Sequence, residues 1–143
     1  MTIEQLSVFV ENKPGKLVEA LETIADAGVD LRALSLADTA DFGILRIIVD
    51  NPQAALDALQ DAGYLVRSND VIPVSVGDKP GGLAAALRVL ADSGIDVEYT
   101  YAFVSHEKER AYVILRVADN AVAAKVLEDN GIPLLTNEDM MNL

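Results

Sequence analysis

Two short segments of this chain carry residues that suit the binding of a zwitterion. They span residues 12–17 and 78–83, and each joins an amide or carboxylate side chain to Lys-Pro-Gly and a leucine. Proline followed by glycine favours the start of a helix, where unpaired N–H groups and the positive end of the helix dipole suit a carboxylate. Gly15 lets a ligand approach that backbone closely. We expect Asn12 and Asp30 at the same edge of the module, where they can accept hydrogen bonds from an ammonium group.

No other residues group into a recognisable catalytic or metal site. The chain has no cysteine, and its single histidine, His106, falls in a charged hairpin. An enzyme needs an activated nucleophile, an acid–base pair or a metal, and the sequence shows neither a cluster of such groups nor a phosphate-binding loop. We therefore predict no catalytic residues, no metal, no cofactor and no enzymatic activity.

The composition argues against several classes of partner. The 143 residues are 51% hydrophobic and carry a net charge of −12. Such an acidic chain repels phosphate backbones and anionic membranes, and no apolar run approaches the ~20 residues that span a bilayer. No secretory signal is visible, and the lack of cysteine fits a reducing compartment. We expect a cytoplasmic protein that binds neither nucleic acid nor membranes.

The two candidate segments recur because the chain repeats itself. An offset of 66 residues relates them, and the same offset relates residues 28–30 (Gly-Val-Asp) to residues 94–96 (Gly-Ile-Asp). Residues 44–46 match residues 114–116 at an offset of 70, and Leu59 matches Leu127 at an offset of 68. The pattern predicts two modules, residues 1–69 and residues 70–143, with a polar break at Asn69–Asp70.

Hydrophobic periodicity predicts the order βαββαβ in each module. In the first module we expect strands near residues 5–10, 31–38, 44–49 and 64–67, with helices near 14–28 and 52–62. In the second module we expect strands near 71–76, 97–105, 111–117 and 133–136, with helices near 81–93 and 121–130. Right-handed crossovers then give a ferredoxin-like α+β module, with a four-stranded antiparallel sheet and two helices on one face. The two modules are expected to pack as a tandem pair.

The repeated Lys-Pro-Gly-x-Leu segments and Gly-x-Asp helix exits resemble the ACT domain family. The resemblance covers residues 3–136 in two copies. ACT domains are small βαββαβ modules that bind amino acids and regulate metabolic enzymes. The resemblance therefore implies a tandem ACT protein without a catalytic domain. Such a protein would sense a free amino acid, regulate a separate metabolic enzyme allosterically and form a homodimer.

The resemblance also implies a set of ligand-binding residues, in sites that lie between two modules. In the first repeat they are Asn12, Pro14, Gly15, Lys16, Leu17, Asp30 and Leu31. In the second repeat they are Asp78, Pro80, Gly81, Gly82, Leu83, Asp96 and Val97. Because Asp78 replaces Asn12 and adds a negative charge near a bound carboxylate, we expect the two repeats to differ in affinity.

Two other functions compete with amino-acid sensing. Proline and glycine at a helix start also serve simply as a turn, so a ligand-free assembly module fits the same residues. The βαββαβ topology also builds RNA-recognition modules, which need exposed aromatic side chains and a basic face. Tyr99, Tyr101 and Phe103 share one face of a strand. Because they lack basic neighbours, we interpret them as packing at a sheet face or at a module interface, or as lining a ligand pocket.

Overall fold

A computed structural model describes residues 2–39, 41–103, 105 and 107–143, so His106 lies outside the described residues. The chain forms two compact units by internal contacts. Residues 4–69 form the first unit, and residues 70–143 together with the start of the chain form the second.

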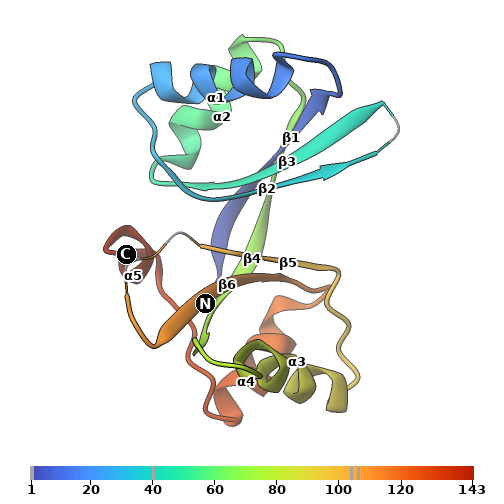
Figure 1. Cartoon of the computed structure of the whole chain (residues 1–143), viewed down its shortest axis with the longest axis vertical. Coiled ribbons are helices and arrows are strands. Elements are labelled where there is room, and N and C mark those ends of the chain that lie inside the picture. Colours follow the sequence, from blue (N-terminus) through green and yellow to red (C-terminus); the bar gives the residue numbers. More distant parts are fainter. Residues whose placement is uncertain (1, 40, 104, 106) are drawn as a thin grey trace. The chain divides into compact units, whose positions relative to one another are not determined.

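The first unit contains the predicted βαββαβ order. Its elements are β1 (Ile3–Glu11), α1 (Lys16–Asp26), β2 (Leu31–Asp38), β3 (Phe42–Val49), α2 (Pro52–Asp61) and the beginning of β4 (Val66–Gly77). Strand β3 pairs antiparallel with both β1 and β2. Helices α1 and α2 pack together on one face of these strands (Figure 1). Alternate strand residues such as Leu6, Val8 and Leu45 point to the helices and are fully buried in the core.

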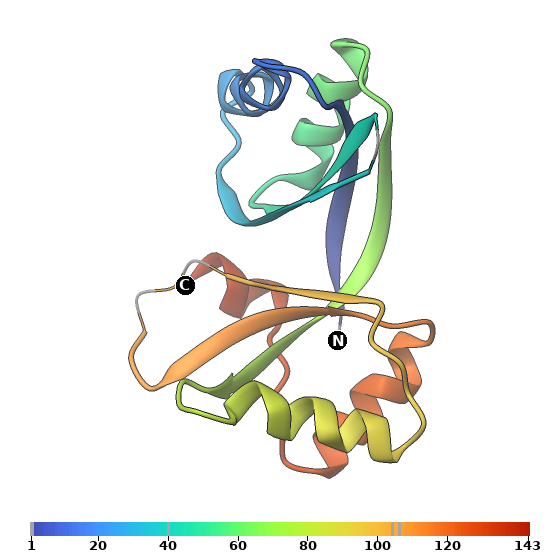
Figure 2. The ribbon, with the colours of Figure 1, turned by 45° about the vertical axis from the view of Figure 1, so that its right-hand side comes forward.

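The second unit repeats this arrangement with the remainder of β4. Its further elements are α3 (Gly82–Asp92), β5 (Tyr99–Ala102), β6 (Arg110–Arg116), α4 (Asn120–Asp129) and α5 (Asn137–Met141). Strand β6 pairs antiparallel with β4 and β5, and α3 and α4 cover one face of these strands (Figure 2). A second core contains Ile72, Leu90 and Leu115, each fully buried. The predicted α+β class is therefore confirmed.

Strand β4 differs from the prediction. We expected separate strands at residues 64–67 and 71–76, but β4 runs without a break from Val66 to Gly77. It takes part in both units in the hydrogen-bonded order β2-β3-β1-β4-β6-β5. The polar stretch remains a strand because its side chains find partners on β1. Ser68 donates to Glu4 over 2.6 Å, and Gln5 donates to Asn69 over 3.3 Å.

The fourth strand predicted for the second module is reduced to one bridge, so the prediction of a four-stranded sheet is wrong there. Residues 133–136 contribute only the pair Leu134 and Val74. The amide of Ser75 donates to the Pro133 carbonyl over 2.9 Å, and that of Leu135 donates to the Pro73 carbonyl over 3.0 Å. Neither bond has a reciprocal partner, because both prolines lack an N–H group.

The offset of 70 in the third strand is also wrong. Glu11 lies opposite Phe42 in the first unit, and Gly77 lies opposite Arg110 in the second. Since Glu11 and Gly77 are related by 66 residues, Phe42 and Arg110 correspond at an offset of 68. Local identity had shifted the match by two residues. The shift leaves every side chain on its expected face, because the strand period is two.

Candidate functional site

The helices at the two repeated motifs begin in the same unusual way. Gly15 precedes α1 with φ 84° and ψ −14°, and Gly81 precedes α3 with φ 84° and ψ −2°. Both residues are therefore left-handed, a conformation that favours glycine. Neither helix start receives a hydrogen bond from a capping side chain.

The second helix of each repeat begins differently. Asn51 caps α2 by accepting from the amide of Ala54 over 3.2 Å, and Asp119 caps α4 by accepting from Val122 over 3.2 Å. Such caps satisfy one of the amides that every helix start leaves unpaired. In the repeated motif of each unit, by contrast, a glycine occupies the N-cap position, so no polar side chain caps the helix start.

The open amides can be named from the backbone hydrogen bonds. In α1 the amide of Lys16 donates to the Lys13 carbonyl over 3.2 Å. The next two amides, those of Leu17 and Val18, have no hydrogen-bond acceptor within the described part of the chain. The same holds in α3, where Gly82 donates to Lys79 over 3.0 Å. Because these N–H groups carry the positive end of the helix dipole, each site can accept a carboxylate.

The structure separates residues that the sequence analysis placed together. The amide of Asn12 donates to the Asp41 carbonyl over 3.0 Å, just before β3 begins. The amide of Asp30 donates to the Asp50 carboxylate over 3.0 Å, just after β3 ends. Eight residues of β3 lie between these points, a span of roughly 23 Å. Asn12 and Asp30 are thus at opposite ends of the unit, since α1 separates them along the chain.

The second repeat shows the same separation. The amide of Asp78 donates to the Glu109 carbonyl over 2.8 Å at the start of β6. Asp96 instead lines a hollow of about 330 Å³ at the far end of α3, together with Glu98 and Asp119. Glu98 is paired with Arg116 at 3.4 Å. No cluster of three or more potential metal ligands is present among the described residues.

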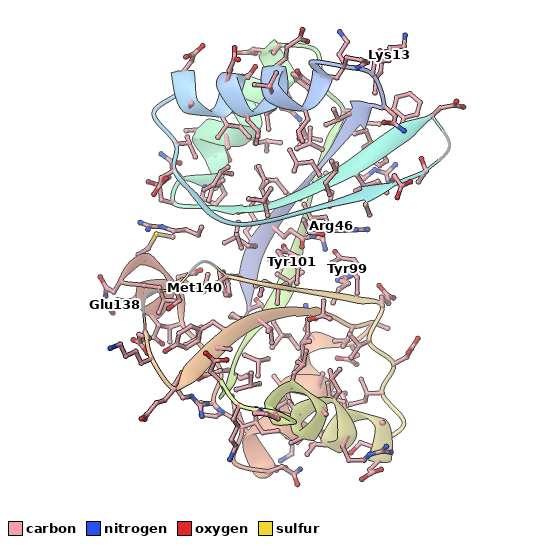
Figure 3. All side chains as sticks on the ribbon, in the orientation of Figure 1. Lys13, Arg46, Tyr99, Tyr101, Glu138 and Met140 are labelled. Atoms are coloured by element: carbon pink, nitrogen blue, oxygen red, sulfur yellow. The ribbon has the colours of Figure 1, made fainter. Side chains whose placement is uncertain are left out.

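The remaining predicted residues divide between the cores and the loops. The apolar ones are partly buried against the two cores: Leu17, Leu31, Leu83 and Val97. The prolines Pro14 and Pro80 are exposed on the loops before the helices. Figure 3 shows Lys13 on the first of these loops, pointing away from the unit.

A pocket lies beside the start of α1. It has a volume of about 500 Å³. It lies among the end of β1, one side of α1, the first residue of β3 and the turn after α2. We call it the first-repeat pocket; its lining residues are Phe9, Glu11, Lys16, Glu19, Phe42, Ala62, Gly63, Tyr64 and Leu65.

A second pocket lies in the corresponding place beside α3. It has a volume of about 560 Å³. We call it the second-repeat pocket; its lining residues are Ser75, Val76, Gly77, Lys79, Gly82, Ala85, Ala86, Arg110, Tyr112, Gly131, Ile132 and Pro133. Of the predicted site residues, only Lys16 and Gly82 line the two pockets.

The polar residues of the second-repeat pocket are not among the residues predicted from the sequence. Lys79 lies inside the repeated motif, and its position there is the signal that could have identified it. Arg110 and Tyr112 lie on alternate residues of β6, so they share a face, and the Nε of Arg110 donates to Ser75 Oγ over 2.9 Å. The hydroxyl of Tyr112 donates to the Glu107 carboxylate, and this hydrogen bond raises the pKa of Tyr112 above its ordinary value.

The aromatic side chains of β5 are not among the lining residues of either pocket. Tyr99 and Tyr101 stand on the face of β5 opposite α3 and α4 (Figure 3), with ring centroids 6.4 Å apart. The shared face predicted for them is confirmed. In the described part of the chain, no helix combines the length and the apolar character needed to cross a membrane.

Comparisons with known proteins agree with the duplicated fold. Protein BT0572 from Bacteroides thetaiotaomicron is 38% identical, with a TM-score of 0.92, and the match covers 100% of this chain and 98% of that one. The regulatory subunit of aspartate kinase from Thermus thermophilus is 18% identical with a TM-score of 0.66, covering 88% and 91% of the two chains. The corresponding subunit from Thermus flavus is 19% identical with a TM-score of 0.62, covering 88% and 90%. At these two lower identities the likeness concerns the fold alone.

No curated protein sequence matches this chain significantly. A family model described as an ACT domain pair matches residues 1–143, so the match includes both repeats and both glycine-capped helix starts. The chain therefore belongs to the ACT domain pair family.

Proposed function

We propose that this chain is an amino-acid-binding regulatory protein with two modules, residues 1–69 and 70–143, and no catalytic role of its own. The observation that carries the proposal is the pair of helix starts at Gly15 and Gly81, which lack a side-chain cap. Their open amides suit the carboxylate of an amino acid. A pocket beside each helix start offers space for the rest of the ligand.

The ammonium group of the ligand needs acceptors near the same helix start. Asn12 and Asp78 are exposed on the loops there and can supply a side-chain oxygen. Asp30, Leu31, Asp96 and Val97 lie at the other ends of their modules. They would contact the ligand only if a second copy of the chain packed its own module against the helix start.

The proposed regulatory role rests on the family and on the fold. Regulatory subunits of aspartate kinase share this fold over most of their length. By analogy, amino-acid binding here would be coupled to a separate metabolic enzyme, and a cytoplasmic homodimer is the proposed assembly. Strand β2 stands at one end of the hydrogen-bonded strand order and carries exposed Leu34 and Leu36. This edge also fits the second candidate function, a ligand-free assembly module.

A thermal screen with the twenty amino acids tests the proposal. A ligand that binds only the folded protein raises its stability by about 2.7 kcal/mol at a hundredfold excess over Kd. For a chain of this size that raises Tm by roughly 10 °C. No shift with any amino acid at millimolar concentration would refute sensing and favour the assembly module.

Matched asparagine variants then locate the site. Asparagine tolerates the left-handed conformation better than other side chains, and a Cβ at Gly15, Gly81 or Gly28 meets nothing within 4 Å. We expect Gly15→Asn or Gly81→Asn to fill a helix start and weaken binding. Gly28→Asn is the control, because it makes the same substitution at another left-handed glycine, at the far end of α1. Equal binding by all three variants would place the site elsewhere.

A further inference from the structure

The two pockets occupy matching positions but differ in charge. The second-repeat pocket is lined by the cations of Lys79 and Arg110 and by no carboxylate. The first-repeat pocket is lined by Glu11, Glu19 and Lys16. In a chain with a net charge of −12, the charged lining residues of the second-repeat pocket are therefore all cations.

The cations of the second-repeat pocket are not neutralised by neighbouring carboxylates. Among the described residues, no carboxylate oxygen lies within 4.0 Å of the charged nitrogens of Lys79 or Arg110. The side chain of Arg110 is held by its hydrogen bond to Ser75, a residue that is only 6% exposed. That bond uses only Nε of Arg110, so the guanidinium keeps further N–H donors for a ligand.

In the first-repeat pocket each charge already has a partner. Lys16 lies 3.4 Å from Glu19, and Lys13 lies 3.2 Å from Glu11. Phe42 stands at the position that Arg110 takes in the second repeat. This pocket therefore offers no uncompensated positive charge to an anion.

Glycine at position 77 shapes the second-repeat pocket. A Cβ at Gly77 would lie 3.4 Å from Cε of Lys79. The stem of Lys79 thus folds back over Gly77, where it would be in van der Waals contact with a Cβ. In the first repeat the corresponding residue is Glu11, whose carboxylate pairs with Lys13 instead.

We propose that the second-repeat pocket binds a small dicarboxylate of the acidic amino-acid class, with one carboxylate on Lys79 and Arg110. This inference rests on the proposed function, because the other carboxylate would use the open amides at the start of α3. A neutral amino acid would occupy those amides but leave both cations unpaired. Charge-assisted bonds of arginine to carboxylate are among the stronger polar contacts, and an arginine can make two at once.

The acidic residues near the pocket do not cancel its charge. Asp78 and Glu109 are next to lining residues in the sequence, but they do not line the pocket themselves. Glu107 accepts the hydrogen bond of the Tyr112 hydroxyl, and Asp139 also lies close enough to interact electrostatically with Tyr112. Neither carboxylate lines the second-repeat pocket, whose charged lining residues are Lys79 and Arg110.

Calorimetric titration of the full chain with L-glutamate, L-glutamine, succinate and inorganic phosphate tests the inference. We expect L-glutamate to bind at least tenfold more tightly than L-glutamine and to weaken as salt is added. Lys79→Gln and Arg110→Gln should each reduce L-glutamate affinity at least tenfold. Lys108→Gln and Arg88→Gln are the controls, because they remove the same charge from exposed positions outside the pocket.

The other results separate failure of this inference from failure of the proposed function. If a neutral or basic amino acid binds and the acidic ones do not, the inference is wrong and the sensing function stands. If none of the twenty amino acids binds, sensing itself fails, and the inference fails with it. Unchanged L-glutamate affinity in Arg110→Gln also overturns the inference. Tighter binding of phosphate than of L-glutamate or succinate would show a general anion site instead.

Discussion

Replacing Gly82 with alanine tests how closely the loop before α3 approaches its helix. A Cβ built on Gly82 lies 1.9 Å from the carbonyl oxygen of Gly77, whereas real Cβ contacts essentially never fall below 3.0 Å. The carbonyl must retreat by at least the 1.1 Å between these values. It belongs to the strand end that pairs with Arg110, so the retreat disturbs one wall of the second-repeat pocket.

The expected cost follows from two opposing effects. Gly82 has no positive φ, and alanine is favoured over glycine in a helix by at most about 1 kcal/mol. Forcing extra atoms into a packed site costs typically about 1–3 kcal/mol, and backbone cannot move aside as easily as the end of a side chain. We expect a net loss of about 1–2 kcal/mol, or roughly 4–8 °C in Tm.

Lys16→Ala is the matched control, because Lys16 is the corresponding residue and already has a Cβ. Its ion pair with Glu19 is exposed, so its loss should cost no more than about 0.5 kcal/mol. Urea unfolding of both variants measures the difference, and L-glutamate titration of Gly82→Ala should show weakened binding. A Gly82→Ala protein as stable as the unmodified chain would refute the close approach and, with it, the structural difference between the two loops.

Three further outcomes are expected. Asn51→Ala should lower the free energy of unfolding by about 1 kcal/mol in urea titrations, because α2 loses its capping side chain. Hydrogen bonds from Thr136 lower the pKa of Asp139 below its ordinary 3.8. The stability that these hydrogen bonds contribute is therefore present above pH 3.8 and is lost as the pH falls through the folded-state pKa. NMR titration should show a higher pKa for Asp139 in Thr136→Ala. Tyr112 should ionise above its ordinary 10.0, with the associated stability lost as the pH rises through the folded-state pKa. Glu107→Gln should lower this pKa in an ultraviolet titration of the phenolate, whereas no change would exclude Glu107 as the cause.

The local pattern of the chain was enough to predict most elements of the fold. Proline and glycine located the starts of α1 and α3, and alternating apolar residues located the paired strands. The continuous strand β4 was missed because its polar stretch resembles a loop until the partners on β1 are known. Helix α5 was missed although Thr136 and Asp139 form a capping box, a spacing that the sequence displays.

The second-repeat pocket could not be predicted from the sequence because its lining residues come from separate segments of the chain. Arg110 reaches the motif only through its pairing with Gly77. Predicting that contact requires the register of β6, and the offset of 70 would have matched Arg110 to residue 40 instead of Phe42. Identical residues are thus enough to recognise the repeat. The contacts that distinguish its two copies depend on the register of the strands, and here an error of two residues hides them.

The charge difference between the pockets distinguishes the two repeats by more than one position. Asp78 in place of Asn12 predicted only that the two sites differ in affinity. Asp78 does not line the second-repeat pocket, whereas Arg110 does, and no carboxylate among the described residues pairs with Arg110.

No single exchange would transfer this charge to the first repeat. An arginine in place of Phe42 would lie beside Glu11, its partner across the strand pair, and in a pocket that also contains Glu19. It would compete with Lys13 and Lys16 for those carboxylates. The second repeat has Gly77 and Ala85 at the two corresponding positions, so its cationic character depends on the loss of two acids as much as on the gain of one base.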